Sequence, residues 1–170
     1  MSSDSLVLRG RVAVVLGDNI DTDIIYPGRY LNITDRALTA EHLFELTYPE
    51  VRGQLKPGDI IVAARNFGCG SSREQAAAAI KYAGAGAVLA SSFARIFYRN
   101  AINLGLPAVV APLASVDCTV GDELEIELSA GAIRNLTSGK AFAAARLDPR
   151  AIELLQAGGL IPYLKQKHAA

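Results

Sequence analysis

Short apolar segments alternate with longer segments of helical composition through the middle of the chain. The apolar segments are rich in Val, Ile, Leu and Ala, and Gly or Pro residues bound them. We therefore expect four strands, over residues 11–16, 60–64, 87–90 and 108–111. Residues 72–83 and 93–104 lie between these strands and are predicted to form helices. This alternation predicts an α/β fold, with right-handed crossovers and a mostly parallel central sheet with flanking helices.

The pattern changes in the last third of the chain. Residues 123–128 alternate charged and apolar side chains, which predicts a strand that pairs with residues 132–136 as a hairpin. Asp148 and Pro149 predict the start of a helix over 151–157, because Pro is favoured at the first helical position. Weaker patterns predict three further features: a loop over 17–29, a short helix over 40–46 and a frayed polar tail after Leu164.

Composition narrows the class of protein. Of the 170 residues, 51% are hydrophobic, and no repeat or linker divides them, so we expect residues 1–170 to form a single domain. The 17 basic residues balance 17 acidic ones, which argues against a nucleic-acid partner. No apolar run has the length of a membrane span, and the first residues do not match a signal peptide. We therefore expect a cytoplasmic protein.

The chain has two cysteines, Cys69 and Cys118. Two are too few for a disulfide scaffold, a closed zinc site or an iron–sulfur cluster held by this chain alone. His42 and His168 match no metal-ligand spacing, so we expect no metal ligands here. Cys69 is a weak candidate nucleophile, because no base partner lies near it in the sequence.

Residues 66–75 (NFGCGSSREQ) carry the strongest chemical signal. They would deliver Ser71, Ser72 and Arg73 to the start of a helix, at the carboxyl end of a strand. Backbone N–H groups and the helix dipole favour anions at such a place. A purely structural interpretation competes with this one, because Ser71 and Glu74 have the spacing of a capping box.

Residues 17–31 (GDNIDTDIIYPGRYL) form a second candidate. Asp at alternate positions suggests a calcium loop, but the required Gly and final Glu are missing, so calcium is not expected. The polar side chains either bond to their own backbone in turns or line a site in a loop that packs inward.

A third candidate is the segment 91–101 (SSFARIFYRNA). Its apolar side chains have core-facing spacing. Arg95 and Arg99 lie one turn apart on another face, where they either hold a carboxylate or are solvated.

Three segments together, residues 17–31, 66–84 and 92–107, resemble the small subunit of 3-isopropylmalate dehydratase. That subunit is the swivelling β/β/α domain of the aconitase superfamily. The resemblance extends over a core from about residue 9 to residue 164. It implies a hydro-lyase that is active only with a separate large subunit, which carries a [4Fe–4S] cluster.

The resemblance also implies residue roles. Ser71 would be the base that removes a proton from the carbon beside a carboxylate, and Ser72 and Arg73 would bind substrate. Asp23 and the residues that follow it would lie at the same cleft. Backbone N–H groups and the Arg73 guanidinium are suited to stabilise a serine alkoxide.

Substrate choice is implied to depend on the residues after Leu31. Homoaconitase-like members have an arginine there, whereas Asn32 and Ile33 stand in this chain. A tricarboxylate would leave a charge unpaired, so isopropylmalate is the expected substrate. Citramalate, dimethylmalate and homoaconitate stay as alternatives, since Arg29 could reach a third carboxylate. A stand-alone carboxylate-binding module and a structural domain that stabilises a partner are alternatives from other classes.

Overall fold

Strand β1 (Val7–Val15) lies in the middle of a seven-stranded sheet in the computed structural model, which describes residues 6–169. The strand order is β4-β3-β2-β1-β5-β6-β7. Residues Val12 to Val15 of β1 pair in parallel with β2 (Ile60–Ala63). Residues Val7 to Arg11 pair in antiparallel fashion with β5 (Glu123–Glu127). One strand therefore joins a parallel half of the sheet to an antiparallel half.

The parallel half confirms the predicted order of strands and helices. From β2 the sheet continues through β3 (Ala87–Ala90) to β4 (Ala108–Val110). All residues of β2 and β3 are buried, which explains why their sequences are apolar without interruption. The crossovers contain helix α4 (Glu74–Tyr82) and helix α5 (Arg95–Asn103).

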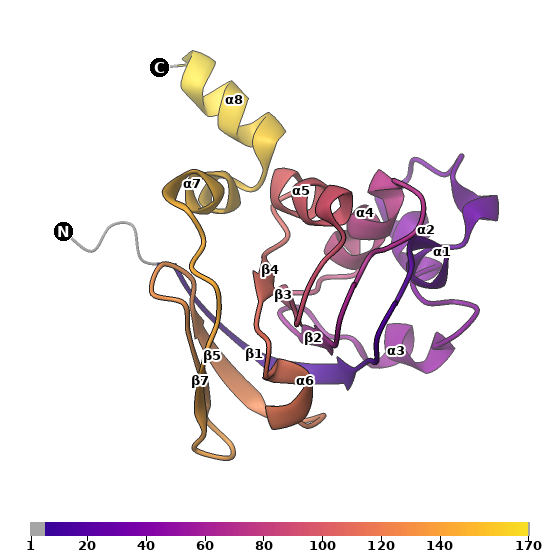
Figure 1. Ribbon diagram of the computed structural model, residues 1–170. Helices are drawn as coiled ribbons and strands as arrows, with labels where there is room; N and C mark the ends of the chain where they lie inside the picture. The colour runs from indigo at the N-terminus through magenta and orange to yellow at the C-terminus, as the bar shows by residue number, and fades with distance from the viewer. Residues whose placement is uncertain (1–5, 170) are drawn as a thin grey trace.

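The antiparallel half confirms the predicted hairpin and adds an edge strand. Strand β5 pairs with β6 (Ala132–Asn135), which pairs with β7 (Ala141–Ala143). Buried and more exposed positions alternate along β5 and β6, as expected for strands with one face against the core. Helix α6 (Ala114–Asp117) precedes β5. Figure 1 shows β1 running from this half toward α1 and α3.

Short helices occupy the region after β1, and the first two of them begin where a loop was expected over residues 17–29. They are α1 (Thr22–Ile25), the 3-10 helix η2 (Gly28–Tyr30), α2 (Arg36–Glu41) and α3 (Pro49–Gln54). The prediction of a helix over 40–46 was wrong in position. Asp35 caps α2 by accepting a hydrogen bond from the Leu38 N–H, and this local cap sets the earlier start.

The C-terminal region contains two helices. Helix α7 (Pro149–Ala157) begins as predicted, with the Asp148 side chain accepting from the Ala151 N–H. The predicted frayed tail was wrong, because helix α8 (Leu160–Ala169) occupies those residues. Its Leu160 and Tyr163 pack against the apolar core, a tertiary contact that the polar sequence pattern does not reveal. None of the helices within residues 6–169 is long and apolar enough to cross a membrane.

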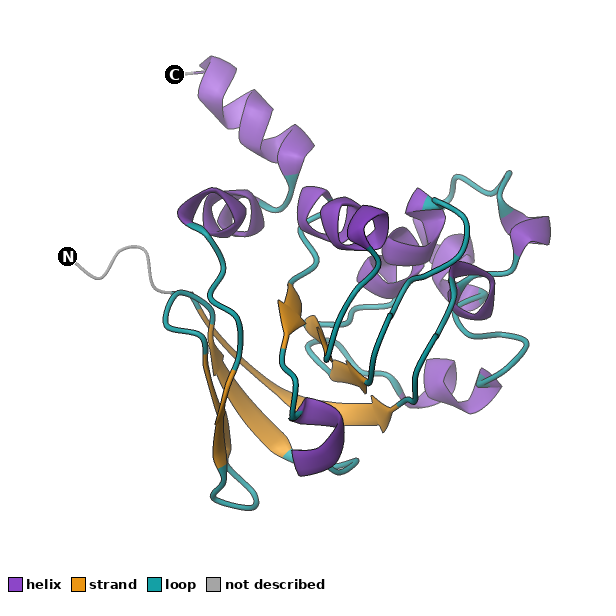
Figure 2. Ribbon diagram, viewed as in Figure 1, coloured by secondary structure: helices purple, strands orange, loops and turns teal. Residues whose placement is uncertain are grey.

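Apolar side chains fill both faces of the parallel half. Alternate residues of β2 contribute to separate cores: Ile61 and Ala63 to one, Ile60 and Val62 to the other. The first core contains the buried face of α4, and the second contains that of α7. The loops after β1, β2 and β3 run alongside one another toward the helices (Figure 2). These loops contain the three segments singled out in the sequence.

Candidate active site

The loops after β1 and β2 are joined by backbone hydrogen bonds. Asp21 and Cys69 form an isolated parallel bridge. The Thr22 N–H donates to the Cys69 carbonyl at 2.8 Å, and the Gly68 N–H donates to the Ile20 carbonyl at 2.7 Å. The first two candidate segments therefore have a fixed relative position.

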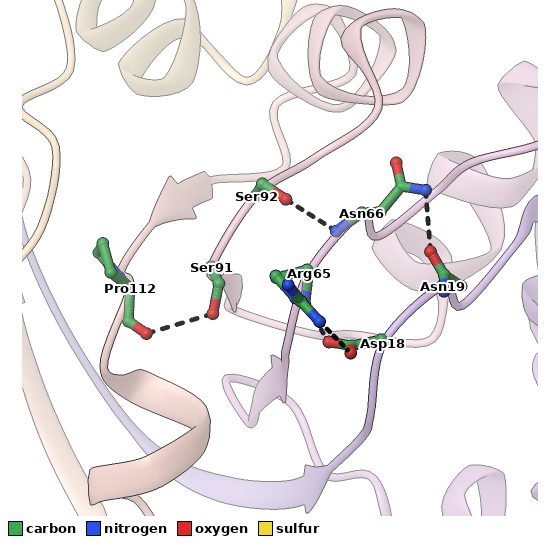
Figure 3. Close-up of polar contacts among 7 residues, drawn as sticks. All are labelled: Asp18, Asn19, Arg65, Asn66, Ser91, Ser92 and Pro112. Carbon is green, nitrogen blue, oxygen red and sulfur yellow. Dashed lines mark hydrogen bonds and ion pairs between the residues drawn. The ribbon is translucent and has the colours of Figure 1, made fainter.

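The loop after β3 is joined to the same assembly. Phe67 and Phe93 form a second parallel bridge, and the Ala94 N–H donates to the Phe67 carbonyl at 2.9 Å. Side chains add cross-links at the base of the loops (Figure 3). They comprise Asn66 Nδ2 to Asn19 Oδ1 (3.0 Å), the Asn66 N–H to Ser92 Oγ (2.8 Å), Arg65 to Asp18 (3.0 Å) and Ser91 Oγ to the Pro112 carbonyl (3.2 Å). All three loops are therefore held as one unit.

A pocket of about 180 Å³ lies where these segments meet. It is lined by Thr22, Gly68, residues 70–73 and residues 94–97. Ser71, Ser72 and Arg73 thus lie together, as the sequence indicated. The pocket also contains Arg95, from the third segment.

Phe97 of α5 and Gly68 lie in direct contact in the lining of this pocket. Phe97 is 2% exposed and packs edge-on against Phe67, with ring centroids 5.2 Å apart. Gly68 has φ +82°, and a Cβ built on it would lie 2.3 Å from Phe97 Cγ. Only glycine fits both the backbone conformation and the space. The loop that carries Ser71 is therefore seated on α5.

Ser71 is exposed and is held by Thr22. The Thr22 hydroxyl donates to the Ser71 carbonyl at 3.0 Å, and the two side-chain oxygens lie 3.5 Å apart. The capping-box interpretation was wrong, because α4 begins at Glu74 and its cap residue, Arg73, makes no side-chain cap hydrogen bond. Neither serine therefore acts as the cap residue of α4, and both serines line the pocket.

Arg73 forms an ion pair with Asp23. Arg73 Nη1 lies 2.9 Å from Asp23 Oδ1, which also accepts from the Gly28 N–H at 2.9 Å. The Arg73 hydrogen bond, and then the Gly28 backbone, lower the pKa of the Asp23 carboxyl. The pair connects the two candidate loops across the edge of the pocket.

Three further predicted binding residues lie outside this pocket. Ile33 lines a separate pocket of about 190 Å³, beside Glu74 and Gln75 of α4. Asn32 is exposed, and the Arg29 guanidinium lies 5.2 Å from the centre of the Tyr30 ring. Ile33 therefore lies near the start of α4, and none of these three residues is in the lining of the pocket that contains Ser71.

Tyr30 anchors this segment to the following helical region. Its ring stacks on the His42 imidazole with centroids 3.6 Å apart, and His42 Nδ1 lies 3.2 Å from Glu45 Oε1. The Tyr30 hydroxyl lowers the pKa of the Glu45 carboxyl, and that carboxyl in turn raises the pKa of the Tyr30 hydroxyl. The segment between Gly28 and Ile33 is thus backed by a polar and aromatic cluster.

The cysteines have no catalytic arrangement in the described part of the chain. Cys69 is half-buried and contributes its carbonyl to the loop bridge. Burial raises the pKa of the Cys118 thiol to about 11, which leaves that thiol protonated and unreactive. Between residues 6 and 169, no three His, Cys, Asp or Glu side chains are grouped to hold a metal ion.

Sequence reasoning missed Thr22 and left Arg95 undecided. Thr22 stands between two Asp residues and was not singled out from its loop, whereas it is 3% exposed and supports Ser71. Arg95 and Arg99 are alike in sequence, but Arg95 alone of the two lines the pocket with Ser71. The spacing of one turn between them could not show which one faces the neighbouring loop.

Comparison with known proteins agrees with the fold and the three segments. Residues 6–112 match the family model of the aconitase C-terminal domain. The 3-isopropylmalate dehydratase small subunit of Pyrobaculum calidifontis is 52% identical over 95% of this chain and 99% of its own length. The methanogen homoaconitase small subunit of Methanothermobacter thermautotrophicus is 52% identical over 94% of this chain and 92% of its own.

A solved structure shows that the similarity extends to the fold. The crystal structure of 3-isopropylmalate dehydratase from Methanocaldococcus jannaschii superposes with a TM-score of 0.87 at 44% identity, covering 96% of both chains. The chain therefore belongs to the aconitase C-terminal domain family that includes the small subunits of 3-isopropylmalate dehydratase.

Proposed function

We propose that this chain is the small subunit of a two-subunit hydro-lyase that converts 2-isopropylmalate to 3-isopropylmalate, a step of leucine biosynthesis. The observation that carries the proposal is the position of Ser71. Its hydroxyl is exposed in a pocket with two arginines, at a helix start that has no side-chain cap. The similar protein of Pyrobaculum calidifontis is named for this activity, which supports the same conclusion.

Ser71 acts as the base in this proposal. As the alkoxide, its Oγ takes the proton from the carbon beside a substrate carboxylate. The C–H electron pair forms the alkene as the neighbouring C–O bond breaks and the hydroxyl leaves. Rehydration then returns the proton and a hydroxyl to the two alkene carbons in the opposite orientation. The nearby guanidiniums and the positive end of α4 stabilise the alkoxide electrostatically.

The partner is a large subunit that holds the [4Fe–4S] cluster. This chain has two cysteines, and one of them is the buried, protonated Cys118. A four-iron cluster needs more thiolate ligands than that. The residues described here do not fit the cluster, so the departure of the hydroxyl depends on groups of the other subunit. Both cysteines are free, as is usual in the cytoplasm, where we place the complex.

Isopropylmalate is the proposed substrate because residues 29–33, the segment implied to select the substrate, offer apolar surface and little free charge. Ile33 is half-buried beside α4, and Arg29 is engaged with the Tyr30 ring. A third carboxylate would have no partner at residues 32–33. Citramalate, dimethylmalate and homoaconitate are the alternatives, and one matching relative is named a homoaconitase small subunit.

The test uses the chain purified anaerobically with its large subunit. Alkene formation is followed from isopropylmalate, citramalate, dimethylmalate and homocitrate in parallel. We expect turnover of isopropylmalate, and we expect Ser71→Ala to abolish it while leaving the complex intact by size-exclusion chromatography. Turnover of another acid alone would change the substrate assignment and keep the chemistry.

Other results would favour the two alternatives to an enzyme subunit, a non-catalytic binding module or a purely structural domain. Carboxylate binding by the isolated chain, with no turnover from a complex that retains its cluster, would favour a non-catalytic binding module. Full activity of the Ser71→Ala complex would contradict the base assignment. If Arg73→Ala also left activity normal, a purely structural role for this chain would follow.

A further inference from the structure

The two arginines in the pocket differ in how their charges are balanced. Arg73 and Arg95 are the charged side chains among the lining residues. Arg73 already pairs with Asp23 at 2.9 Å. Arg95 forms no ion pair or side-chain hydrogen bond with any residue between 6 and 169. The excess positive charge of the pocket therefore comes from Arg95.

The position of Arg95 relative to Ser71 is set by rigid contacts. Arg95 is the first residue of α5, directly after Ala94, whose N–H donates to the Phe67 carbonyl. Two residues further on, Phe97 packs against Gly68. The Ser71 loop and the start of α5 are thus joined at two points, and Arg95 and Arg73 line the same pocket.

The first turn of α5 is also open to a ligand. Its cap residue, Ala94, has no side chain that could accept a hydrogen bond. Helix α7, which has the same length, is capped by Asp148. The backbone dipole at the start of α5 adds to the Arg95 charge and favours an anion there.

We propose that Arg95 binds a carboxylate of the dicarboxylate substrate, opposite the carboxylate bound near Arg73. This inference rests on the proposed function, because it needs a substrate with two carboxylates. Within the pocket, Asp23 offsets the Arg73 charge, so without Arg95 the chain would offer no net positive charge to two anionic groups. A guanidinium fork is suited to a carboxylate, because it donates two parallel hydrogen bonds. Arg95 thereby contributes binding energy that the substrate and the transition state share.

Arg99 provides a matched control for the test. It is an exposed arginine on the same helix, four residues further on, and it does not line the pocket. Complexes containing Arg95→Ala, Arg95→Lys and Arg99→Ala are assayed with isopropylmalate. We expect Arg95→Ala to raise KM by roughly 10- to 100-fold with kcat nearly unchanged, since a lost charge-assisted hydrogen bond weakens binding by that factor. Lysine should restore part of the loss, and Arg99→Ala should match the wild type.

A binding measurement separates recognition from chemistry. In the Ser71→Ala complex, which should bind without turnover, the Kd of isopropylmalate is measured by calorimetry with and without Arg95→Ala. We expect Arg95→Ala to raise this Kd by the same factor as the KM.

If the wild-type complex turns over isopropylmalate normally, three results would overturn the assignment of Arg95. They are an unchanged KM and Kd in Arg95→Ala, a loss of kcat with KM unchanged, and dissociation of the Arg95→Ala complex, which would make Arg95 an interface residue. Absence of wild-type turnover would instead overturn the proposed function, and this inference with it.

Discussion

Gly68→Ala tests the contact that seats the loop carrying Ser71 on α5. Two penalties combine at this position. The residue has φ +82°, and an L side chain in the left-handed region costs roughly 1–2 kcal/mol. The added Cβ would also lie 2.3 Å from Phe97 Cγ and 2.4 Å from Phe97 Cβ. Overpacking of a buried contact typically costs about 1–3 kcal/mol. The free energy of unfolding should therefore fall by roughly 2–5 kcal/mol.

Two other glycines separate these penalties. Gly121 has φ +96° with open space around its Cβ position, so Gly121→Ala measures backbone strain alone. Gly70 has φ +94° in the same loop as Gly68, and its Cβ would make ordinary contacts at 3.5 Å. Both variants should lose roughly 1–2 kcal/mol.

Urea unfolding followed by circular dichroism gives the free energies for all three variants. The difference between Gly68→Ala and the two controls is the cost of displacing Phe97. Activity of the complex should fall most in Gly68→Ala, because the loop that holds Ser71 must move away from α5. If Gly68→Ala is no less stable than Gly121→Ala, the contact with Phe97 does not fix the loop, and the reasoning fails.

Three further predictions concern acid stability, thiol reactivity and a buried amide. Arg73 lowers the pKa of the Asp23 carboxyl, so the pair stabilises the fold above pH 3.8, the ordinary pKa of Asp, and this stability is lost as the pH falls below that value. In acid titrations of the unfolding free energy, Asp23→Asn should reduce this loss of stability. An unchanged pH profile in the variant would contradict the pairing. Cys118, with a pKa of about 11, should react with iodoacetamide at pH 8 only after unfolding, as mass spectrometry of native and urea-treated protein will show. Asn135 is 1% exposed and donates to Asp122 at 2.7 Å, so Asn135→Ala should reduce the unfolding free energy by about 1–3 kcal/mol, and a loss near zero would mean that water replaces the amide.

Local patterns predicted the parallel half of the sheet well. Strands β2 and β3 are buried on both faces, so apolar residues alone predict them. The start of α7 was also predictable, because its Asp-Pro pair acts within one turn. Helix α8 was missed because its few core contacts are tertiary, and the residues after Leu164 are mostly polar.

The candidate site was predictable in its residue types but not in its pairings. The sequence indicates that Ser71 and Arg73 lie at a helix start, because a strand–loop–helix pattern surrounds them. It does not reveal that Thr22, from a loop 49 positions away, holds Ser71. Nor does it show that Arg73 faces Asp23 while Arg95 stays free, because these distances depend on how three loops pack together.

The dual pairing of β1 has a consequence for fragments of this protein. The matched family region ends at residue 112, before β5, β6 and β7. A chain cut there would leave Val7 to Arg11 of β1 without their antiparallel partner. That half of β1 would become an exposed edge with unpaired backbone groups, ready to add strands from other molecules. Strand β5 thus covers this edge of β1, and a fragment that ends at residue 112 should precipitate rather than fold.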